Sequence, residues 1–299
     1  MANNYKTLNG FAGLAPELKI KIFQALPNLH SAVALRLTCS ELNELYLRYE
    51  SGIKAALRDR QVQVISSFYT FLTTLHIPRS ALKHPPSDGW SHMDPQNCAE
   101  FGKTGFVVDV LRHLPYIAET ANLGDNLHNI ELRCYALDYS TRTPAEFRSI
   151  DSKMSAWLSE PLSKHKILVA KNSGNGGMVL VLDTARAEIN VQIIPYRGDL
   201  VMDIGGYFNM AARRCRNLEI MFVPGHDTIV DIEWKPEDGN GDKCPDNVGS
   251  LLAQEETYPT RRDAKWIRYL YRKAGWPGTE YQKERALRAI KMFVEARMD

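Results

Sequence analysis

The chain has 299 residues, of which 44% are hydrophobic and 24% charged, as in an ordinary globular protein. Its formal net charge of +2 excludes a surface directed as a whole at polyanions, although not a local basic patch. No apolar run is long enough to span a membrane, and the first residues lack the apolar core of a signal peptide.

The five cysteines are dispersed along the chain and form no C-x-x-C pair. An odd, scattered set in a chain without a secretion signal is typical of reduced thiols inside a cell. We therefore expect the protein in the cytoplasm or the nucleus, with no membrane contact.

Apolar residues at helical spacing follow a proline in the N-terminal segment. Pro16 suits the first turn of a helix, where its missing N–H costs nothing. Leu18, Ile22 and Leu26 follow at four-residue spacing and form one apolar stripe. Ser31 is a candidate N-cap for a second helix, and a third follows before residue 50. Three such short helices cannot bury their apolar surface among themselves, so they need the rest of the chain or a partner.

This segment resembles an F-box. The matching residues are Leu14, Pro16, Glu17, Leu18, Ile22 and Leu26, followed by Leu35, Leu37, Thr38, Cys39 and Ser40. Ala15 interrupts the family's usual Leu-Pro pair, and Asn43 stands near a position that is tryptophan-like in the family. The resemblance implies binding to a Skp1-type adaptor and recruitment of a cullin ubiquitin ligase. The partner-binding residues would then be Leu14, Pro16, Leu18, Ile22, Leu26 and Leu35.

Helical periodicity continues beyond this segment. Apolar residues between Ile53 and Leu75 recur at three-, four- and seven-residue spacing, which predicts a helix that ends before Pro78. A turn-rich sequence follows at 84–90. We therefore divide the chain into an F-box-like helical module at 8–49, a helical connector at 50–83 and a larger domain at 84–299.

Strands dominate the middle of the larger domain. Apolar runs at 166–170 and 178–182 flank a glycine-rich turn, and 187–194 alternates apolar with polar residues. This pattern predicts an antiparallel sheet with at least one wetted face. We also expect a helix at about 200–215 and another capped by Thr260. The predicted fold class is α+β, with the three-helix F-box-like module followed by an antiparallel sheet domain flanked by helices.

The region 84–298 resembles a group of uncharacterised fungal proteins. The shared segments lie at 84–90, 103–117, 180–184 and 271–277. The order of elements is also similar to the SMI1/KNR4 (SUKH) binding fold, an antiparallel sheet backed by helices. Neither resemblance brings a catalytic motif with it.

Two short segments begin like ligand-binding loops, but neither completes the motif that such a loop requires. The sequence from Asp238 to Asp242 begins like an EF-hand, yet Lys243 stands where that loop needs glycine and Gly249 where it needs glutamate. The glycines at 174–177 lead into a strand and not a helix, so we interpret them as a hairpin turn.

One cluster of polar residues could line a pocket. Asp109, Arg112 and His113 share a helix face at three- and four-residue spacing, and Asp138 is a candidate neighbour. Arginine in such a place can anchor an anionic ligand, and histidine can exchange protons near neutral pH. The alternative is an ion pair with a histidine that caps the helix end.

No catalytic or metal-binding signature is present. The histidines and cysteines lack the close spacing of a zinc site, and there is no H-E-x-x-H or G-x-S-x-G sequence. We expect neither a metal nor a cofactor. The basic stretch 261–297 is diluted by acidic residues, which favours a solvated helix surface over a nucleic-acid interface.

These observations favour an F-box-like adaptor that binds a Skp1-type partner and presents an unknown target protein to a cullin ubiquitin ligase. One alternative is a non-catalytic binding or regulatory domain whose N-terminal helices pack in cis. The other is an enzyme of unfamiliar type in a biosynthetic pathway, which would need converging polar groups near Asp109, Arg112 and Asp138.

Overall fold

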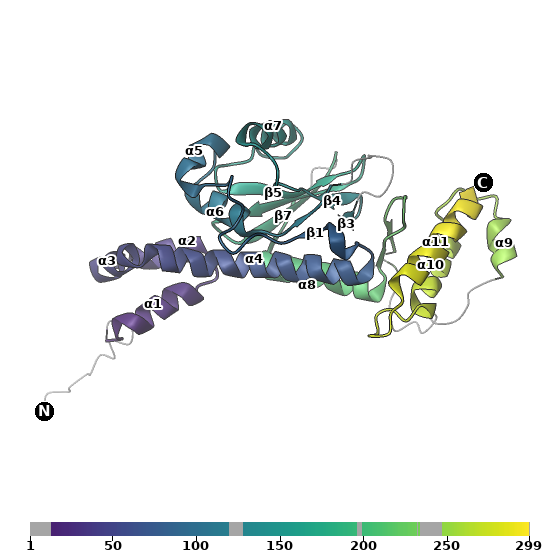
Figure 1. Ribbon diagram of the computed structural model, residues 1–299, viewed down its shortest axis with the longest axis horizontal. Helices are drawn as coiled ribbons and strands as arrows, with labels where there is room; N and C mark the ends of the chain where they lie inside the picture. Colours follow the sequence, from purple (N-terminus) through teal and green to yellow (C-terminus); the bar gives the residue numbers. More distant parts are fainter. Residues whose placement is uncertain (1–12, 120–127, 196–198, 232, 234–246, 299) are drawn as a thin grey trace, which may run out of the picture.

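One long helix runs beneath an antiparallel sheet and connects two groups of helices at opposite ends of the molecule (Figure 1). The computed structural model describes residues 13–119, 128–195, 199–231, 233 and 247–298. The mixture of helices and a single large antiparallel sheet confirms the predicted α+β class. The sequence 238–242, which begins like an EF-hand loop but does not complete one, lies outside the described residues.

The N-terminal group contains the three predicted short helices. They are α1 (Pro16–Ala25), α2 (Leu29–Arg36) and α3 (Ser40–Arg48). The predicted N-cap of α2 is wrong, because the helix begins two residues earlier than Ser31. Asn28 is the cap instead, and its side-chain oxygen accepts a hydrogen bond from the Ser31 backbone N–H at 2.8 Å.

The long helix α4 (Glu50–Leu75) matches the helix predicted from Ile53 to Leu75. Its buried residues recur every three or four positions, so they lie on one side of the helix. They are Ile53, Leu57, Gln61, Ile65, Phe68, Tyr69, Leu72, Thr73 and Leu75. This continuous buried stripe contacts α1 and α3 near its start, and α6 and α8 farther along.

The sheet is a six-stranded antiparallel meander, in which every strand pairs with its neighbours in sequence. Its strands are β3 (Asn129–Glu131), β4 (Cys134–Ala136), β5 (Lys166–Asn172), β6 (Met178–Asp183), β7 (Glu188–Ile193) and β8 (Asp199–Asp203). The two apolar runs predicted as central strands are β5 and β6, and β6 is buried at all but its last position. The predicted hairpin turn at 174–177 lies between them.

The predicted helix at 200–215 is only partly correct. Its first residues form β8, which pairs with β7, and helix α8 (Ile204–Asn217) starts immediately afterwards. The Asp203 side chain accepts a hydrogen bond from the Gly206 N–H and so caps the helix. Strand pairing at the sheet edge therefore decides where the helix can begin.

Helices cover the sheet on both sides. Helices α4 and α8 run alongside each other on one side, whereas α7 (Pro144–Ser155) lies on the other (Figure 1). Two further helices, α5 (Cys98–Phe101) and α6 (Gly105–His113), lie near the N-terminal half of α4.

Two small sheets and two 3-10 turns complete this region. The small sheets join β1 (Leu82–Lys83) to β2 (Tyr116–Ile117), and β9 (Ile220–Met221) to β10 (Ile229–Val230). The 3-10 turns are η1 (Arg79–Ala81) and η2 (Pro95–Asn97).

The C-terminal group consists of α9 (Val248–Leu252), α10 (Arg261–Lys273) and α11 (Lys283–Met298). Thr260 caps α10 as predicted, in a capping box with Asp263. The group is tied to the last turn of α4, where carbonyl groups have no partner within the helix. The Lys283 ammonium donates hydrogen bonds to the carbonyls of Thr73 and Ile77, at 3.0 and 3.1 Å.

The turn between β6 and β7 holds the N-terminal helices against the sheet. The Asn28 amide donates to the Arg186 carbonyl at 2.8 Å, and the His30 backbone N–H donates to the Ala185 carbonyl at 2.8 Å. From α4, the buried Gln61 amide donates to the Thr184 carbonyl at 2.9 Å. One hairpin turn therefore anchors both α2 and α4.

We expect Asn28→Ala to lower the free energy of unfolding by about 1–2 kcal/mol, because it removes the cap of α2 and one bond to the turn. Chemical denaturation measures this change. Asn209→Ala, on the exposed surface of α8, is the matched control and should change stability by less than about 0.5 kcal/mol. Equal effects of the two substitutions would contradict the anchoring role of Asn28.

Candidate functional site

Helix α1 buries one side and exposes another. Lys19 and Phe23, one turn apart, are its buried residues, and the Lys19 ammonium forms an ion pair with Glu41 of α3. Leu18 and Ile22 are offset from that buried pair by one position each. Leu18 is 48% exposed and Ile22 is half-buried, so the predicted apolar stripe does not face the interior at this end of α1.

The six residues predicted to bind a partner are divided between surface and core. Pro16 is exposed like Leu18, and Leu14 is half-buried like Ile22. Leu26 and Leu35 pack against the hydrophobic core, so they stabilise the bundle itself. Sequence patterning did not indicate three further exposed apolar side chains near the ends of α2 and α3, namely Leu37, Leu47 and Tyr49.

The residues predicted to line a polar pocket form separate structural contacts. Asp109 accepts a hydrogen bond from Arg58 at 2.9 Å, and its backbone carbonyl lies 2.8 Å from Nδ1 of His113. Asp138 is held elsewhere, by Lys83 at 2.7 Å and by the Ser140 hydroxyl at 2.6 Å.

Arg112 holds the loop that precedes α5. Its Nε donates to the Asp88 carbonyl at 2.7 Å, and Nη1 donates to the Met93 carbonyl at 3.3 Å. Gly89, at φ 75°, lies so close that an added Cβ would stand 2.4 Å from Cγ of Arg112. The four predicted residues thus form ion pairs and loop contacts, and none lines the cavity described next.

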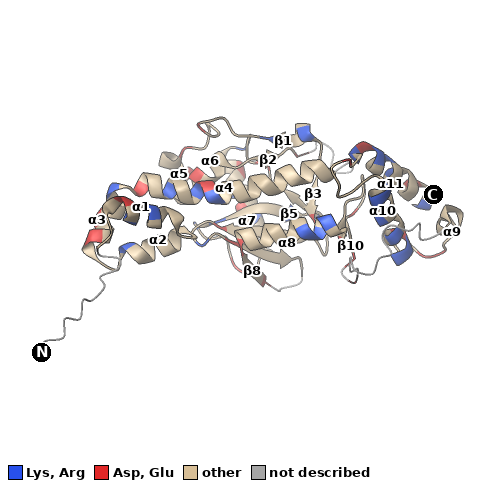
Figure 2. Cartoon of the chain, turned by 90° about the horizontal axis from the view of Figure 1, so that it is seen from below, with Lys and Arg blue, Asp and Glu red and all other residues tan. Residues whose placement is uncertain are grey.

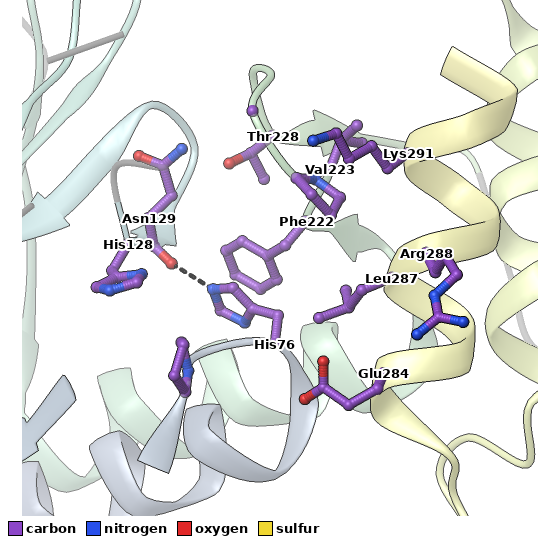
Figure 3. A pocket seen from close by; sticks show the side chains of 13 residues that line it. His76, His128, Asn129, Phe222, Val223, Thr228, Glu284, Leu287, Arg288 and Lys291 are labelled. Atoms are coloured by element: carbon purple, nitrogen blue, oxygen red, sulfur yellow. Dashed lines mark hydrogen bonds between the residues drawn. The ribbon is translucent and has the colours of Figure 1, made fainter. Parts of the chain in front are cut away.

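A cavity of about 370 Å³ lies between α11, the end of α4 and the loop that follows β9 (Figure 3). Its volume is within the range of small-molecule sites in proteins. Apolar side chains and polar groups both line it. The lining residues are His76, Pro78, His128, Asn129, Phe222, Val223, Pro224, Gly225, Thr228, Glu284, Leu287, Arg288 and Lys291.

His76 forms part of one wall and is fixed in a single orientation. Its ring stacks on Phe222 with centroids 3.7 Å apart and an interplanar angle of 4°. Nε2 lies 2.8 Å from the Asn129 carbonyl, which can only accept, so Nε2 carries the proton. Burial lowers the pKa of His76 to about 3. The imidazole is therefore neutral near pH 7.

Two buried acceptors in this wall have no donor among the described residues. They are Nδ1 of His76 and the side-chain oxygen of Asn129. A buried acceptor without a partner costs about 1–3 kcal/mol. The wall thus retains polar groups that packing alone does not explain, which is a common property of binding sites.

Charged groups of α11 form the opposite side of the cavity. Figure 3 shows Lys291 on the side of Val223 and Thr228, whereas Glu284 lies at the other end beside His76. Arg288 stands between them on the same helix. All three charged residues are exposed, so their charged groups are accessible to a ligand.

The described residues contain no candidate metal cluster, and two of their three free cysteines are buried. No group of three or more histidine, cysteine or acidic residues there could hold a metal ion. Burial raises the pKa of both Cys134 and Cys215 well above the ordinary thiol value, so neither is a reactive thiolate. No helix among the described residues is long and apolar enough to cross a membrane.

Comparison with known proteins provides no relative: no family model, no curated protein and no solved structure matches the chain.

The sequence did not predict this cavity, because its walls come from four distant parts of the chain. His76 directly follows α4, Asn129 belongs to β3, Phe222 follows β9 and Leu287 belongs to α11. The only local signal is the charge pattern of α11, in which Glu284, Arg288 and Lys291 recur at four- and three-residue spacing and so share one side.

We expect His76→Phe to reduce the loss of stability in mild acid. The pKa of His76 in the folded protein lies below its ordinary value of 6.5. The neutral imidazole therefore contributes its full share to the free energy of unfolding above pH 6.5, and this share is lost as the pH falls. Between pH 7.5 and pH 5, the shifted pKa of His76 lowers the free energy of unfolding of the wild type by about 2 kcal/mol. The variant should not show this decrease. Urea denaturation at both values measures the difference between the two proteins.

Glu131, whose pKa burial raises to about 7, titrates in the opposite sense, and it does so in both proteins. The comparison therefore isolates His76. His84→Phe, at an exposed position, is the matched control and should retain the dependence of the wild type. A His76→Phe variant with unchanged pH dependence would show that His76 is not held neutral.

Proposed function

We propose that the protein is an adaptor that binds a Skp1-type partner through the exposed apolar side of α1 and presents a target protein to a cullin ubiquitin ligase. The sheet domain and the C-terminal helices would hold that target. The observation that carries the proposal is the exposure of Pro16 and Leu18 at the position where the sequence resembles an F-box.

The arrangement of α1 supports this use of its surface. Burying a leucine gains about 1.5–3 kcal/mol, yet Leu18 stays in solvent while the neighbouring Lys19 is buried. Burial of a lysine is costly unless it is paired, and here Glu41 supplies the partner. The chain thus places an apolar side chain outside and a charged one inside, an inversion that favours an interface at Leu18.

A second candidate is a binding or regulatory domain whose N-terminal helices pack in cis. The contacts of α2 favour it, because Asn28 and His30 hydrogen-bond to the turn between β6 and β7. Leu26 and Leu35 also belong to the internal packing. In this function α1 to α3 complete the fold, and the cavity at the other end becomes the main binding site.

The first test is direct binding of the purified chain to a purified Skp1-type protein, measured by calorimetry. We expect Leu18→Asp to weaken this binding at least tenfold, because it places a charge in an apolar contact. Ile22→Asp would extend the test to the next turn of the same stripe. Retention of the native circular dichroism spectrum shows that each variant is folded.

The matched control is Met292→Asp, which changes an exposed apolar residue on α11 at the opposite end of the molecule. It should leave the affinity unchanged. Absence of binding by the folded wild type, or equal losses from Leu18→Asp and Met292→Asp, would reject the adaptor function in favour of packing in cis.

A further inference from the structure

We propose that the cavity beside α11 binds a small amphiphilic anion: a compact apolar molecule with an anionic group at one end and a hydrogen-bond donor at the other. This site lies at the end of the molecule opposite α1 (Figure 1). The proposal therefore does not depend on the adaptor function.

The body of the ligand would occupy the apolar middle of the cavity. Phe222 and Val223 form one wall, and Leu287 of α11 faces them (Figure 3). The Phe222 ring stacks parallel on the His76 ring. A volume of about 370 Å³ admits a molecule of the size of two fused rings.

The anionic group would face Lys291 and Arg288. Arg288 makes no ion pair or hydrogen bond with the rest of the chain that the structure describes, so its guanidinium is available to a ligand. Lys291 pairs with Glu295, one turn along the same helix, at 3.7 Å. Both partners of that pair are exposed, so the pair is weak and an incoming anion can displace it.

The opposite end of the cavity selects a donor and repels an anion. Glu284 lies there beside His76, and its ion pair with Lys283, at 3.9 Å, leaves the Glu284 side chain 82% exposed. The neutral His76 and the Asn129 side chain each add one unpaired acceptor, Nδ1 and the amide oxygen. Cations at one end and hydrogen-bond acceptors at the other fix the orientation of the ligand. A purely apolar cavity would not select an orientation in this way.

Arg216 and Arg79 line another cavity without any acidic residue, together with Lys283. Arg216 is already placed over the ring of Phe71 at 4.6 Å, and the Lys283 ammonium binds carbonyls of α4. Two of its three cations thus serve structural contacts, whereas Arg288 in the cavity beside α11 makes none with the described residues.

The test uses 6-hydroxy-2-naphthoate, which has a carboxylate, a flat apolar body and a hydroxyl donor, titrated into the full chain by calorimetry. We expect saturable binding at one site. Arg288→Glu combined with Lys291→Glu should raise the Kd at least tenfold, because the carboxylate loses its cations. The uncharged 2-naphthalenemethanol should bind the wild type and this double variant equally.

A probe without the hydroxyl donor tests the end of the cavity at Glu284. 2-Naphthoate, which lacks the hydroxyl, should bind the wild type several times more weakly than the hydroxylated probe. In a Glu284→Ala variant the two acids should bind equally, because the acceptor for the hydroxyl is gone.

Arg285→Glu is the matched control, since Arg285 is an exposed cation of the same helix that does not line the cavity. It should change the Kd less than twofold. The proposal is overturned if the folded wild type shows no saturable binding of the probe, or if Arg285→Glu weakens it as much as the double variant. All variants change exposed side chains, and an unchanged thermal melt verifies that each is folded.

Discussion

The buried stripe of α4 is the constraint on which the rest of the structure depends. It runs from Ile53 to Leu75 without an exposed gap and provides the apolar surface against which the N-terminal helices, α6 and α8 pack. A buried stripe along most of a 26-residue helix is too long for any one short helix to cover. Its burial requires that several elements assemble around one axis.

Polar contacts then fix how the elements around α4 are placed. At the buried middle of the helix, Gln61 reaches the carbonyl of Thr184 in the turn between β6 and β7. At its C-terminus, Lys283 and Tyr281 satisfy carbonyls that the helix leaves free, the latter at 3.1 Å from Leu75. Apolar burial is non-directional, so these few directed bonds decide the position of each end group.

The two candidate sites arise at the two ends that α4 separates. Near its start, α1 leaves Leu18 outside while Lys19 pairs internally with Glu41. Beyond its last turn, His76 forms a cavity wall that α11 completes. The basic residues visible on α10 and α11 accordingly differ in role (Figure 2): Arg268 is buried against Asp231, whereas Arg288 faces solvent at the cavity.

Local chemistry in the sequence determined the elements. Spacing of apolar residues located α4 and three of the six strands of the meander, β5, β6 and β7, and Thr260 identified the start of α10. Helix periodicity, strand alternation and capping all depend on near neighbours. Only the tertiary structure decided that 200–203 would pair with β7 as a strand and that Asn28 would cap α2. It also decided which apolar residues of the stripe in α1 face solvent, and it alone assembled the cavity from His76, Phe222 and α11. These outcomes depend on contacts between residues far apart in the chain, whose energies no local pattern contains.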